Sequence, residues 1–517
     1  MVYKLLLPLI ALESFLLFLI FFWINKSYIK DILSEIDKKT WVFLFFVVIS
    51  AFILRLVIPP LQHIMYIDEP WYMEAAKNML QNFSQGDYPK SIGWPFILSI
   101  SFLFFGVSNW VALYTAVVLG TLTILNVFLL MYIITKKKLI SLFSAAIFSL
   151  VPLHIRWSAS AETNIPSLFF VTLTLFFCFL YYRKRVYSLL WLAISSITFT
   201  VLIRPDNYLL IPLFFLGCLI FKVKISTKRI ILILFFLIVL VSPSILQSLD
   251  WYSSFNRLET ESGGQLIANN WSLSNLIYNS LHFGPNIFSK AYLPFFIPIL
   301  SIIGFIYMLF KQKREACFLI IWFIFFWILF FSSWVQTIGG RERFFLSFYP
   351  SIIIFVGYGL QLFLNLVHKT MIKPQLKNIF CFFIILVPIF MFFPYTLKAT
   401  DMHNALCVKL ETRVPELAEE DIPSDAIIVA NWPTILKSTT DLDVIDINYF
   451  LGDYSFQNAA FKGTSLLLFF EDYCCFDFPQ NDLYKKNCEM MKKKFKLQPY
   501  KEYSEGKNKY TFYKVIR

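Results

Sequence analysis

The stretch WVALYTAVVLGTLTILNVFLLMYIITKKK, residues 110–138, decides the fold class of this chain. No charged side chain occurs from 110 to 135, and three lysines, Lys136 to Lys138, follow at once. An apolar run of about 20 residues is long enough to cross the hydrocarbon core of a bilayer as a helix. Lysine and arginine collect in cytoplasmic loops. The stretch therefore predicts a transmembrane helix that ends at the cytoplasmic face.

The composition of the whole chain agrees with this prediction. Of its 517 residues, 58% are hydrophobic and 15% are charged, and the mean hydropathy is +0.65. About a quarter of the residues of a soluble domain are charged, so we expect a polytopic membrane protein. The net charge of +13 lies in short clusters between apolar runs. This distribution is typical of topology signals, and we expect no nucleic-acid partner.

The apolar runs predict a mostly α-helical protein with about twelve transmembrane helices. The first run has no clear cleavage site, so we expect it to remain as a helix. The run at 94–106 is short, and counting it as a crossing would move every later basic cluster to the outer face. We expect an outer-side juxtamembrane or re-entrant helix there. The expected spans are 3–24, 41–59, 110–135, 139–153, 165–182, 188–203, 207–222, 230–248, 294–310, 316–334, 345–366 and 379–396.

Alternating spans bring all the basic clusters to one face, which we identify as cytoplasmic. Both termini, the active site and the longer loops, the first of which is 60–109, are then extracytoplasmic in a multi-pass protein of the cell membrane. The clusters are Lys26/Lys30/Lys38/Lys39, Lys136–Lys138, Arg183–Arg185, Lys222/Lys224/Lys228/Arg229, Lys311/Lys313/Arg314 and His368/Lys369/Lys373/Lys377.

Three regions follow from these patterns. Residues 1–40 form an extra N-terminal transmembrane helix with a basic cytoplasmic loop, and 41–396 form the main membrane domain. The more polar tail, 397–517, is expected to be a small extracytoplasmic α/β domain, because strand-like runs at 425–431, 464–470 and 509–516 enclose helical stretches. Its basic segment MMKKKFKLQPYKEY is expected to be a solvated face. Disulfides are plausible in an extracytoplasmic tail, and its cysteines are Cys407, Cys474, Cys475 and Cys488.

Adjacent carboxylates open the first outer loop, in YIDEPWYMEAAKNML. Asp68 is a good N-cap and Pro70 suits a first turn, so we expect a helix over 70–82. Its apolar side chains fall on one face of this helix and its polar side chains, including Lys77, fall on the other. This pattern predicts a helix that lies in the membrane interface. On this basis alone Asp68 caps the helix, and Glu69 complements its N-terminal dipole.

Further outer loops carry acids and bases to the same membrane face. An arginine binds phosphate through two parallel hydrogen bonds and a lysine supplies a point charge, while a nearby carboxylate can act as a general base. The set therefore favours a site for an anionic ligand. Its members are Lys90, His154, Arg156, Glu162, Arg204, Asp206, Arg341, Glu342 and Arg343.

The order of these motifs resembles the GT-C superfamily of membrane glycosyltransferases. It is most similar to the glycosyltransferase family 39 group, which contains the protein O-mannosyltransferases and the lipid A aminoarabinose transferases. The motifs are YIDEPWYMEAAKNML, GDYPKSIGWPFIL, SASAETNIPSLFF, RPDNY and RERFFLSFYPSIIIF, within about residues 41–366. The family's double proline is absent after Lys90, and Phe344 stands where the family usually has a tyrosine.

The resemblance implies a hexosyl- or pentosyltransferase that uses a polyprenyl- or dolichyl-phosphate sugar and a protein, lipid or glycan hydroxyl. It implies that Asp68, with Glu69 beside it, is the general base. It also implies that the donor phosphate is bound by Lys90, Arg204, Arg341 and Arg343, and that His154, Arg156, Glu162 and Asp206 orient substrate. No metal or other cofactor is expected, although Asp68 and Glu69 with Glu162 or Asp206 leave a divalent ion as the alternative.

The competing hypothesis is a transporter or flippase of lipid-linked glycans. Ionisable residues would then line a path through the middle of the membrane. Glu13 is the main charge found inside the expected spans, whereas the other polar groups gather at one face. This distribution favours an enzyme with an outer-facing site.

Overall fold

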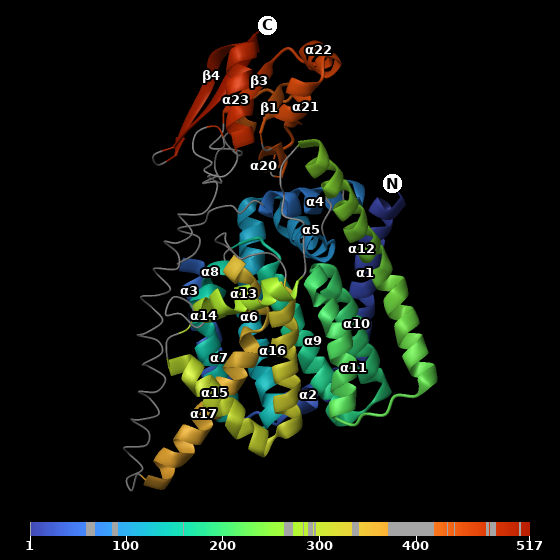
Figure 1. The fold of residues 1–517 in the computed structure, drawn as a ribbon, viewed down its shortest axis with the longest axis vertical. Coiled ribbons are helices and arrows are strands. Elements are labelled where there is room, and N and C mark those ends of the chain that lie inside the picture. The colour runs from blue at the N-terminus through green and yellow to red at the C-terminus, as the bar shows by residue number, and fades with distance from the viewer. Residues whose placement is uncertain are drawn as a thin grey trace. The chain divides into compact units, whose positions relative to one another are not determined.

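The structure is a computed structural model of the full chain (Figure 1). It describes residues 2–57, 68–84, 91–158, 160–262, 272–282, 284–287, 293, 296–332, 341–370, 418–431, 433–438, 440–471, 475, 482–505 and 508–516. The chain divides into two compact units. The helical unit comprises Met1–Gln62, Pro89–Ile97 and Leu113–Asp401, and the second unit comprises His63–Tyr88, Leu98–Ala112 and Met402–Arg517.

Helices make up the first unit. They are α1 (Val2–Ile24), α2 (Lys26–Ser34), α3 (Lys38–Val57), α6 (Asn109–Thr135), α7 (Lys138–Ser149), α8 (Pro152–Trp157), α9 (Asn164–Lys184), α10 (Tyr187–Ile203), η2 (Pro205–Leu209), α11 (Leu210–Ile220), α12 (Thr227–Ser262), α13 (Leu273–His282), α14 (Gly284–Ile287), α15 (Phe296–Lys311), α16 (Lys313–Ser332), η3 (Arg341–Ser347) and α17 (Tyr349–Thr370). The helix α5 (Gly93–Phe105) begins in this unit.

Among the described residues, 7 helices are long and apolar enough to cross a membrane, and they lie in α1, α3, α6, α9, α12, α16 and α17. The apolar helices α5, α7, α10, Pro205–Ile220 and α15 are shorter. Each expected span from 3–24 to 345–366 overlaps one of these helices. The span expected at 379–396 lies outside the described residues. The predicted polytopic, mostly α-helical class is confirmed. The short run at 94–106 forms α5.

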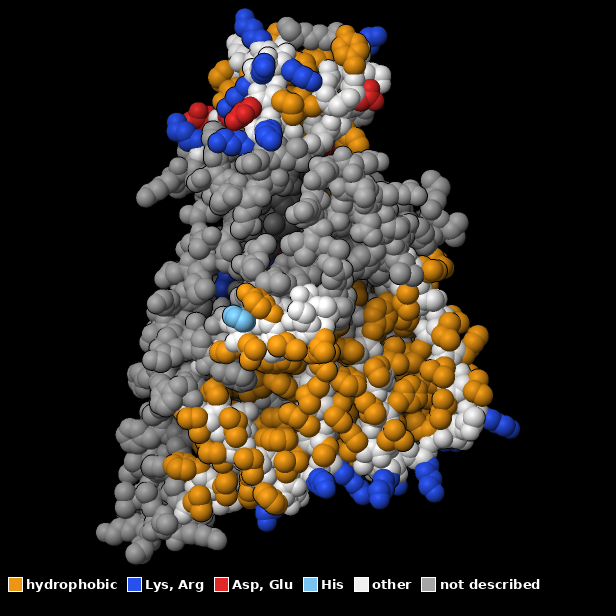
Figure 2. All heavy atoms as spheres, viewed as in Figure 1, with side chains coloured by type: hydrophobic (Ala, Val, Ile, Leu, Met, Phe, Trp, Pro, Cys, Tyr) orange, Lys and Arg blue, Asp and Glu red, His pale blue; other side chains and the backbone are white. Residues whose placement is uncertain are grey.

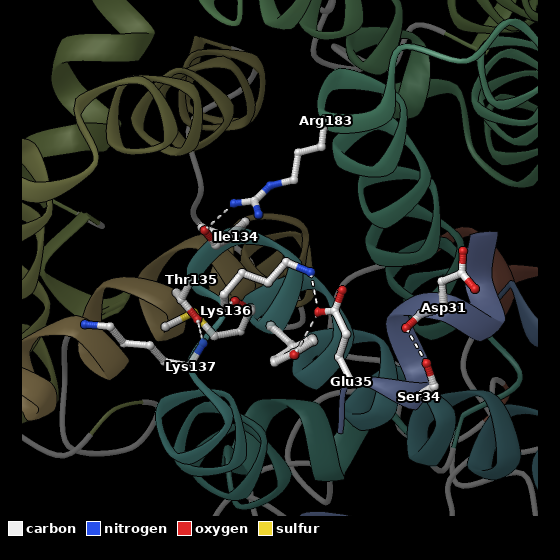
Figure 3. Close-up of polar contacts among 10 residues, drawn as sticks. Asp31, Ser34, Glu35, Ile134, Thr135, Lys136, Lys137 and Arg183 are labelled. Carbon is white, nitrogen blue, oxygen red and sulfur yellow. Dashed lines mark hydrogen bonds and ion pairs between the residues drawn. The ribbon is translucent and has the colours of Figure 1, made fainter. Parts of the chain in front are cut away.

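Two of the basic clusters, Lys136–Lys138 and Arg183–Arg185, meet at one end of the helical unit. Lys136 at the end of α6 pairs with Glu35 between α2 and α3 (2.6 Å), and Arg183 at the end of α9 donates to the Ile134 carbonyl (2.8 Å). Figure 3 shows both cationic side chains reaching across to these partners. The Lys136 ammonium lowers the pKa of the Glu35 carboxyl. In Figure 2 hydrophobic side chains cover the visible face of this unit, and Lys and Arg gather at one of its edges.

The second unit contains a mixed five-stranded sheet with the order β2-β1-β3-β5-β4. Strands β1, β2 and β3 are parallel to one another, and β5 runs antiparallel to β3 and β4. The elements of this unit are α4 (Glu69–Asn82), β1 (Ile427–Ala430), α20 (Pro433–Lys437), β2 (Asp443–Asp446), α21 (Ile447–Gly452), α22 (Tyr454–Gly463), β3 (Leu467–Glu471), α23 (Asp482–Lys494), β4 (Lys496–Glu505) and β5 (Asn508–Ile516).

Alternate residues of the central strands fill two cores, one on each face of the sheet. Ile428 and Leu468 belong to one core, whereas Val429 and Phe469 belong to the other. This alternation is the period of two expected of a strand whose two faces are both covered. The three predicted strands are present. The segment expected to be a solvated face is mostly exposed, and it also contains most of β4, which pairs with β5. A disulfide joins Cys475 to Cys488; Cys407 and Cys474 lie outside the described residues.

The predicted helix over 70–82 is present as α4, but two details were wrong. Asp68 holds the N-cap position, but its carboxylate accepts no capping hydrogen bond from the first turn of the helix. Lys77, expected on the exposed polar face, is buried. Its ammonium finds partners in the C-terminal segment, described below, and these partners are distant in sequence and gave no local signal.

Candidate functional site

A polar cluster lies at the end of the helical unit opposite the basic end. The helix α9 runs from Asn164 in this cluster to Lys184 at the basic end. The cluster is built by α8, the start of α9, η2 and η3, and η3 packs against both α8 and α9. We call this set of side chains the arginine cluster; it comprises Arg156, Trp157, Glu162, Asn164, Arg204, Asp206, Arg343 and Phe344.

Arg204 is placed by the proline that follows it. A residue before proline is disfavoured in the helical region, and Arg204 is extended (φ −159°, ψ 133°), so α10 ends there. Its side chain is buried. The Nε group pairs with Asp206 Oδ2 at 2.7 Å, and Nη1 donates to Asn164 Oδ1. The guanidinium of Arg204 is therefore fixed in direction by two partners.

Neighbouring contacts hold this corner rigid. Asn207 donates to the Thr200 carbonyl (2.9 Å) and bonds with Ser167, which ties η2 to α9 and α10. A Cβ added at Gly93, the first residue of α5, would lie 2.7 Å from the Ile203 nitrogen. Only glycine allows α5 to begin against the end of α10. The neighbouring Trp94 donates to the Ala161 carbonyl (2.6 Å), which fixes the loop that carries Glu162.

Arg343 enters the cluster from η3. Its Nη1 lies 3.6 Å from Glu162 Oε1, an ion pair in which the carboxylate is almost completely buried. Burying a carboxylate is costly unless it is paired, so Arg343 and Glu162 stabilise each other's positions. Stacking of Phe344 on Phe330 of α16 anchors the same turn (ring centroids 5.2 Å apart).

Cations and aromatic rings alternate through the cluster. The Arg204 Cζ lies 4.8 Å from the centre of the Phe344 ring, and the Arg343 Cζ lies 5.4 Å from it. Arg343 also lies 5.4 Å from the Trp157 ring, with Arg156 at 5.7 Å from that ring. Rings attract guanidinium groups by about 0.5–2 kcal/mol each. The two rings therefore lie beside three positive charges and offset part of their mutual repulsion.

His154 lies in a second buried group beside this cluster. Its Nδ1 is 2.6 Å from Arg55 Nη2, and Arg55 Nε donates to Ser158 Oγ (3.2 Å). Because a guanidinium only donates, Nδ1 of His154 is the acceptor. The ring is neutral in this arrangement, and its proton is on Nε2. Burial, and then the charge of Arg55, lower the pKa of His154 well below its usual value.

Five of the predicted site residues come together in this cluster: Arg156, Glu162, Arg204, Asp206 and Arg343. His154 is fully buried and bound to Arg55. Lys90 and the Arg341 side chain lie outside the described residues. Asp68 and Glu69 belong to the second unit, where Asp68 is half-buried and Glu69 is buried. In the described part of the chain, no three His, Cys, Asp or Glu side chains are grouped closely enough to hold a metal ion.

Sequence reasoning missed Arg55, Trp157, Asn164 and Phe344 as members of these groups. Glu13 was taken as the main charge in the spans, yet Arg55 is a fully buried cation in the last turn of α3. A usable signal was present, since arginine is costly in an apolar helix unless it has partners. Trp157 and Phe344 directly adjoin predicted arginines, which was also a usable signal.

Comparisons with known proteins bear on this site. Residues 89–246 match the family model of the dolichyl-phosphate-mannose-protein mannosyltransferases. This range includes Glu162, Arg204 and Asp206. An uncharacterized protein from Aquifex aeolicus (strain VF5) is 29% identical over 155 residues, which are 28% of this chain and 31% of that protein. The match therefore spans less than a third of that curated relative's length.

Solved structures of similar fold include two that hold a lipid phosphate. One is the archaeal oligosaccharyltransferase AglB from Archaeoglobus fulgidus, in complex with an inhibitory peptide and a dolichol-phosphate; it is 13% identical, with a TM-score of 0.52 over 84% of this chain and 70% of that chain. The other is ArnT from Cupriavidus metallidurans bound to undecaprenyl phosphate; it is 12% identical, with a TM-score of 0.55 over 92% of this chain and 98% of that chain. The chain thus has the GT-C fold that its motifs predicted.

Proposed function

We propose that this protein is a membrane glycosyltransferase that takes a sugar from a polyprenyl- or dolichyl-phosphate carrier. The acceptor is a hydroxyl of a protein, lipid or glycan at the extracytoplasmic face. The observation that carries the proposal is the pair Arg204 and Arg343, both beside the ring of Phe344, within a chain of GT-C fold. Two oriented guanidinium groups suit a phosphate better than any neutral ligand.

The reaction moves one glycosyl group between two oxygens. The acceptor oxygen forms a bond to the anomeric carbon, the bond from that carbon to the phosphate oxygen breaks, and the lipid phosphate leaves with the electron pair. Negative charge grows on the leaving phosphate as the bond breaks. Preorganised cations placed at a developing charge are an effective source of transition-state stabilisation. We assign that role to Arg204 and Arg343 and, by the resemblance, also to Lys90 and Arg341.

The proton of the acceptor hydroxyl needs a base. We assign this role to Asp68, which follows an early span as in the family that the motifs resemble, and whose carboxylate is not used to cap α4. Glu69 is the neighbouring carboxylate, and it either assists Asp68 or favours the N-terminal dipole of α4.

The remaining polar side chains are proposed to orient the substrates. Asp206 and Glu162 each hold a guanidinium, and their other oxygen lone pairs can accept hydrogen bonds from sugar hydroxyls. Arg156 adds a third cation, beside the Trp157 ring. His154, bound to Arg55, acts as a neutral donor through Nε2. We propose that no metal is needed, because the arginines supply the positive charge that a divalent ion would otherwise supply.

The donor class is supported by the comparisons. The family model names dolichyl-phosphate mannose, and the two similar structures hold dolichol-phosphate and undecaprenyl phosphate. We therefore propose a lipid monophosphate sugar as donor. The acceptor and the sugar are proposed only as classes.

Purified full-length protein in nanodiscs tests this function. Polyprenyl-phosphate sugar labelled in the sugar is supplied with a membrane extract as acceptor, and both the transfer of label and the release of free polyprenyl phosphate are measured. We expect both to rise together, and to fall by about tenfold or more for Arg204→Gln, equivalent to at least about 1.4 kcal/mol. The same protein in proteoliposomes tests the alternative: movement of the intact labelled lipid across the bilayer, without release of phosphate, would instead support the transporter.

A further inference from the structure

A buried lysine of the first outer loop binds the C-terminal α/β domain. Lys77 of α4 is 8% exposed. Its Nζ donates to the Thr440 carbonyl at 2.6 Å and pairs with Asp441 Oδ1 at 2.6 Å. The helix α4 also packs against α20, the short helix that precedes these two residues. All these residues belong to the second unit, so the contact joins segments that are 363 positions apart in the sequence.

The receiving segment is itself held in place. Thr440 bonds to the Leu436 carbonyl through both its amide (3.0 Å) and its hydroxyl (2.7 Å). The Asp441 amide donates to Glu419 Oε1 (3.0 Å). Residues 440 and 441 lead directly into β2, which pairs with the central strand β1. Lys77 is thus bound to the framework of the sheet and not to a loosely attached loop.

The chemistry of the contact is selective for a cation. An ammonium group carries three donors and no acceptor, and burying it without partners would be costly. Here a carbonyl and a carboxylate accept from it. Consistent with this pairing, the hydrogen bond from Lys77, and then its charge, lower the pKa of Asp441.

The same helix begins at the acidic pair. Lys77 lies eight positions after Glu69, which is about 12 Å along an α-helix. Most of the side chains between them are buried, including Tyr72, Met73, Ala75 and Ala76. Because α4 is held at Lys77 and is buried along its length, its first turn is also held in place. That turn carries Glu69 and follows Asp68.

We infer that Lys77 is a positioning residue through which the C-terminal domain holds α4, and with it the Asp68–Glu69 pair. The C-terminal domain is then part of the catalytic machinery and not a separate accessory module. The catalytic consequence rests on the proposed function, whereas the contact itself does not.

The test uses full-length protein in nanodiscs and two readouts. Hydrogen–deuterium exchange of residues 69–82 measures how firmly α4 is held, and steady-state transfer measures kcat and the donor KM. The variants are Lys77→Met, the milder Asp441→Asn, which retains the bond to the Thr440 carbonyl, and the charge-preserving Lys77→Arg. The control is Lys509→Met, which breaks a more exposed ion pair with Glu502 (2.9 Å) in the same domain.

We expect Lys77→Met to speed exchange in α4 and to lower kcat about tenfold, with the donor KM within about twofold. Tenfold in rate corresponds to about 1.4 kcal/mol. Asp441→Asn should lie between Lys77→Met and the wild type, Lys77→Arg should restore most of kcat, and Lys509→Met should leave exchange in α4 unchanged. If Lys77→Met does not fold, Asp441→Asn carries the test.

Unchanged exchange of α4 in both Lys77→Met and Asp441→Asn would overturn the inference. Faster exchange with an unchanged kcat would also overturn it, because α4 would then be held for stability alone. If the wild type transfers no sugar from any lipid-phosphate donor, the proposed function fails, and the exchange measurement still decides whether Lys77 holds α4.

Discussion

Arg204 and Arg343, which are far apart in sequence, lie against the same aromatic ring, at 4.8 Å and 5.4 Å from the centre of Phe344. Two like charges near the same ring repel each other, and their attraction to the ring offsets part of that repulsion. Asp206 and Glu162 offset a further part, since each pairs with one of the two arginines. The protein therefore holds two guanidinium groups close together before any phosphate binds.

The first prediction concerns Phe344. Phe344→Leu removes the ring and keeps an apolar side chain, so both guanidinium groups lose an attraction of about 0.5–2 kcal/mol. We expect kcat/KM for the lipid-phosphate donor to fall by about tenfold or more, and Phe344→Tyr to retain most of it. The control is Phe345→Leu, because Phe345 lies in the same turn as Phe344 and packs on Phe331 of α16. An equal loss in both leucine variants would mean that the turn is damaged and that Phe344 has no specific role.

The second prediction concerns the shape of the guanidinium at Arg204. The Arg204 guanidinium bonds to both Asp206 and Asn164 through donors fixed in one plane, and a lysine ammonium has no such planar set of donors. Arg204→Lys should therefore raise the donor KM by about tenfold, equivalent to about 1.4 kcal/mol, although the charge is kept. Arg229→Lys is the matched control, since Arg229 lies over the Tyr187 ring (4.8 Å) at the basic end. An unchanged donor KM in Arg204→Lys would mean that only the positive charge matters, and it would refute the proposal that two oriented guanidinium groups bind the phosphate.

The third prediction concerns stability against pH. The pKa of His154 is held well below its usual value of about 6.5 by burial and by Arg55. Above that value the histidine is neutral in both the folded and unfolded chains. Below about pH 6.5 the histidine of the unfolded chain binds a proton, whereas the buried histidine of the folded chain stays neutral. Folding stability therefore falls as pH decreases from about 7 to 5.

His154→Asn should make the thermal midpoint of the protein in nanodiscs less dependent on pH over this window. His282→Asn, which changes an exposed histidine, should leave the wild-type dependence in place. The explanation fails if the two variants show the same pH profile.

The fourth prediction concerns metal ions. Because arginines are proposed to bear the charge of the leaving phosphate, excess chelator should leave the initial rate of transfer within about twofold of the untreated enzyme. Added magnesium or manganese should not restore a rate lost in Arg204→Gln. Abolition of transfer by chelator, reversed by a divalent ion, would assign the phosphate charge to a metal.

Much of the membrane fold followed from local patterns. Apolar runs such as 110–135 and basic clusters such as Lys136–Lys138 report on the chain within about 20 residues, and a bilayer constrains helices on that scale. The same reasoning placed Glu162, Arg204 and Arg343 at one face, and the structure brings these three into one cluster. Their common position in loops predicted at one membrane face was sufficient to predict that they meet.

Features that depend on distant partners could not be predicted in this way. Lys77 reads as a solvated residue of an amphipathic helix, because its partners at 440 and 441 are remote in sequence. Arg55 reads as one polar residue in an apolar run, because its partners Ser149, His154 and Ser158 come from another hairpin. Strand β2 has only 4 residues and was missed, since its parallel pairing with β1 gives it no pattern of its own.

The most direct test of the account is the rate of sugar transfer by Asp68→Asn in nanodiscs, with binding of the lipid-phosphate donor measured on the same preparation. Glu74→Gln, which removes another carboxylate of α4, is the matched control. Loss of a general base is expected to lower kcat by about 10²–10⁴-fold. The account predicts a loss of this size in Asp68→Asn alone, with donor binding retained, whereas transfer at the wild-type rate by Asp68→Asn would contradict it.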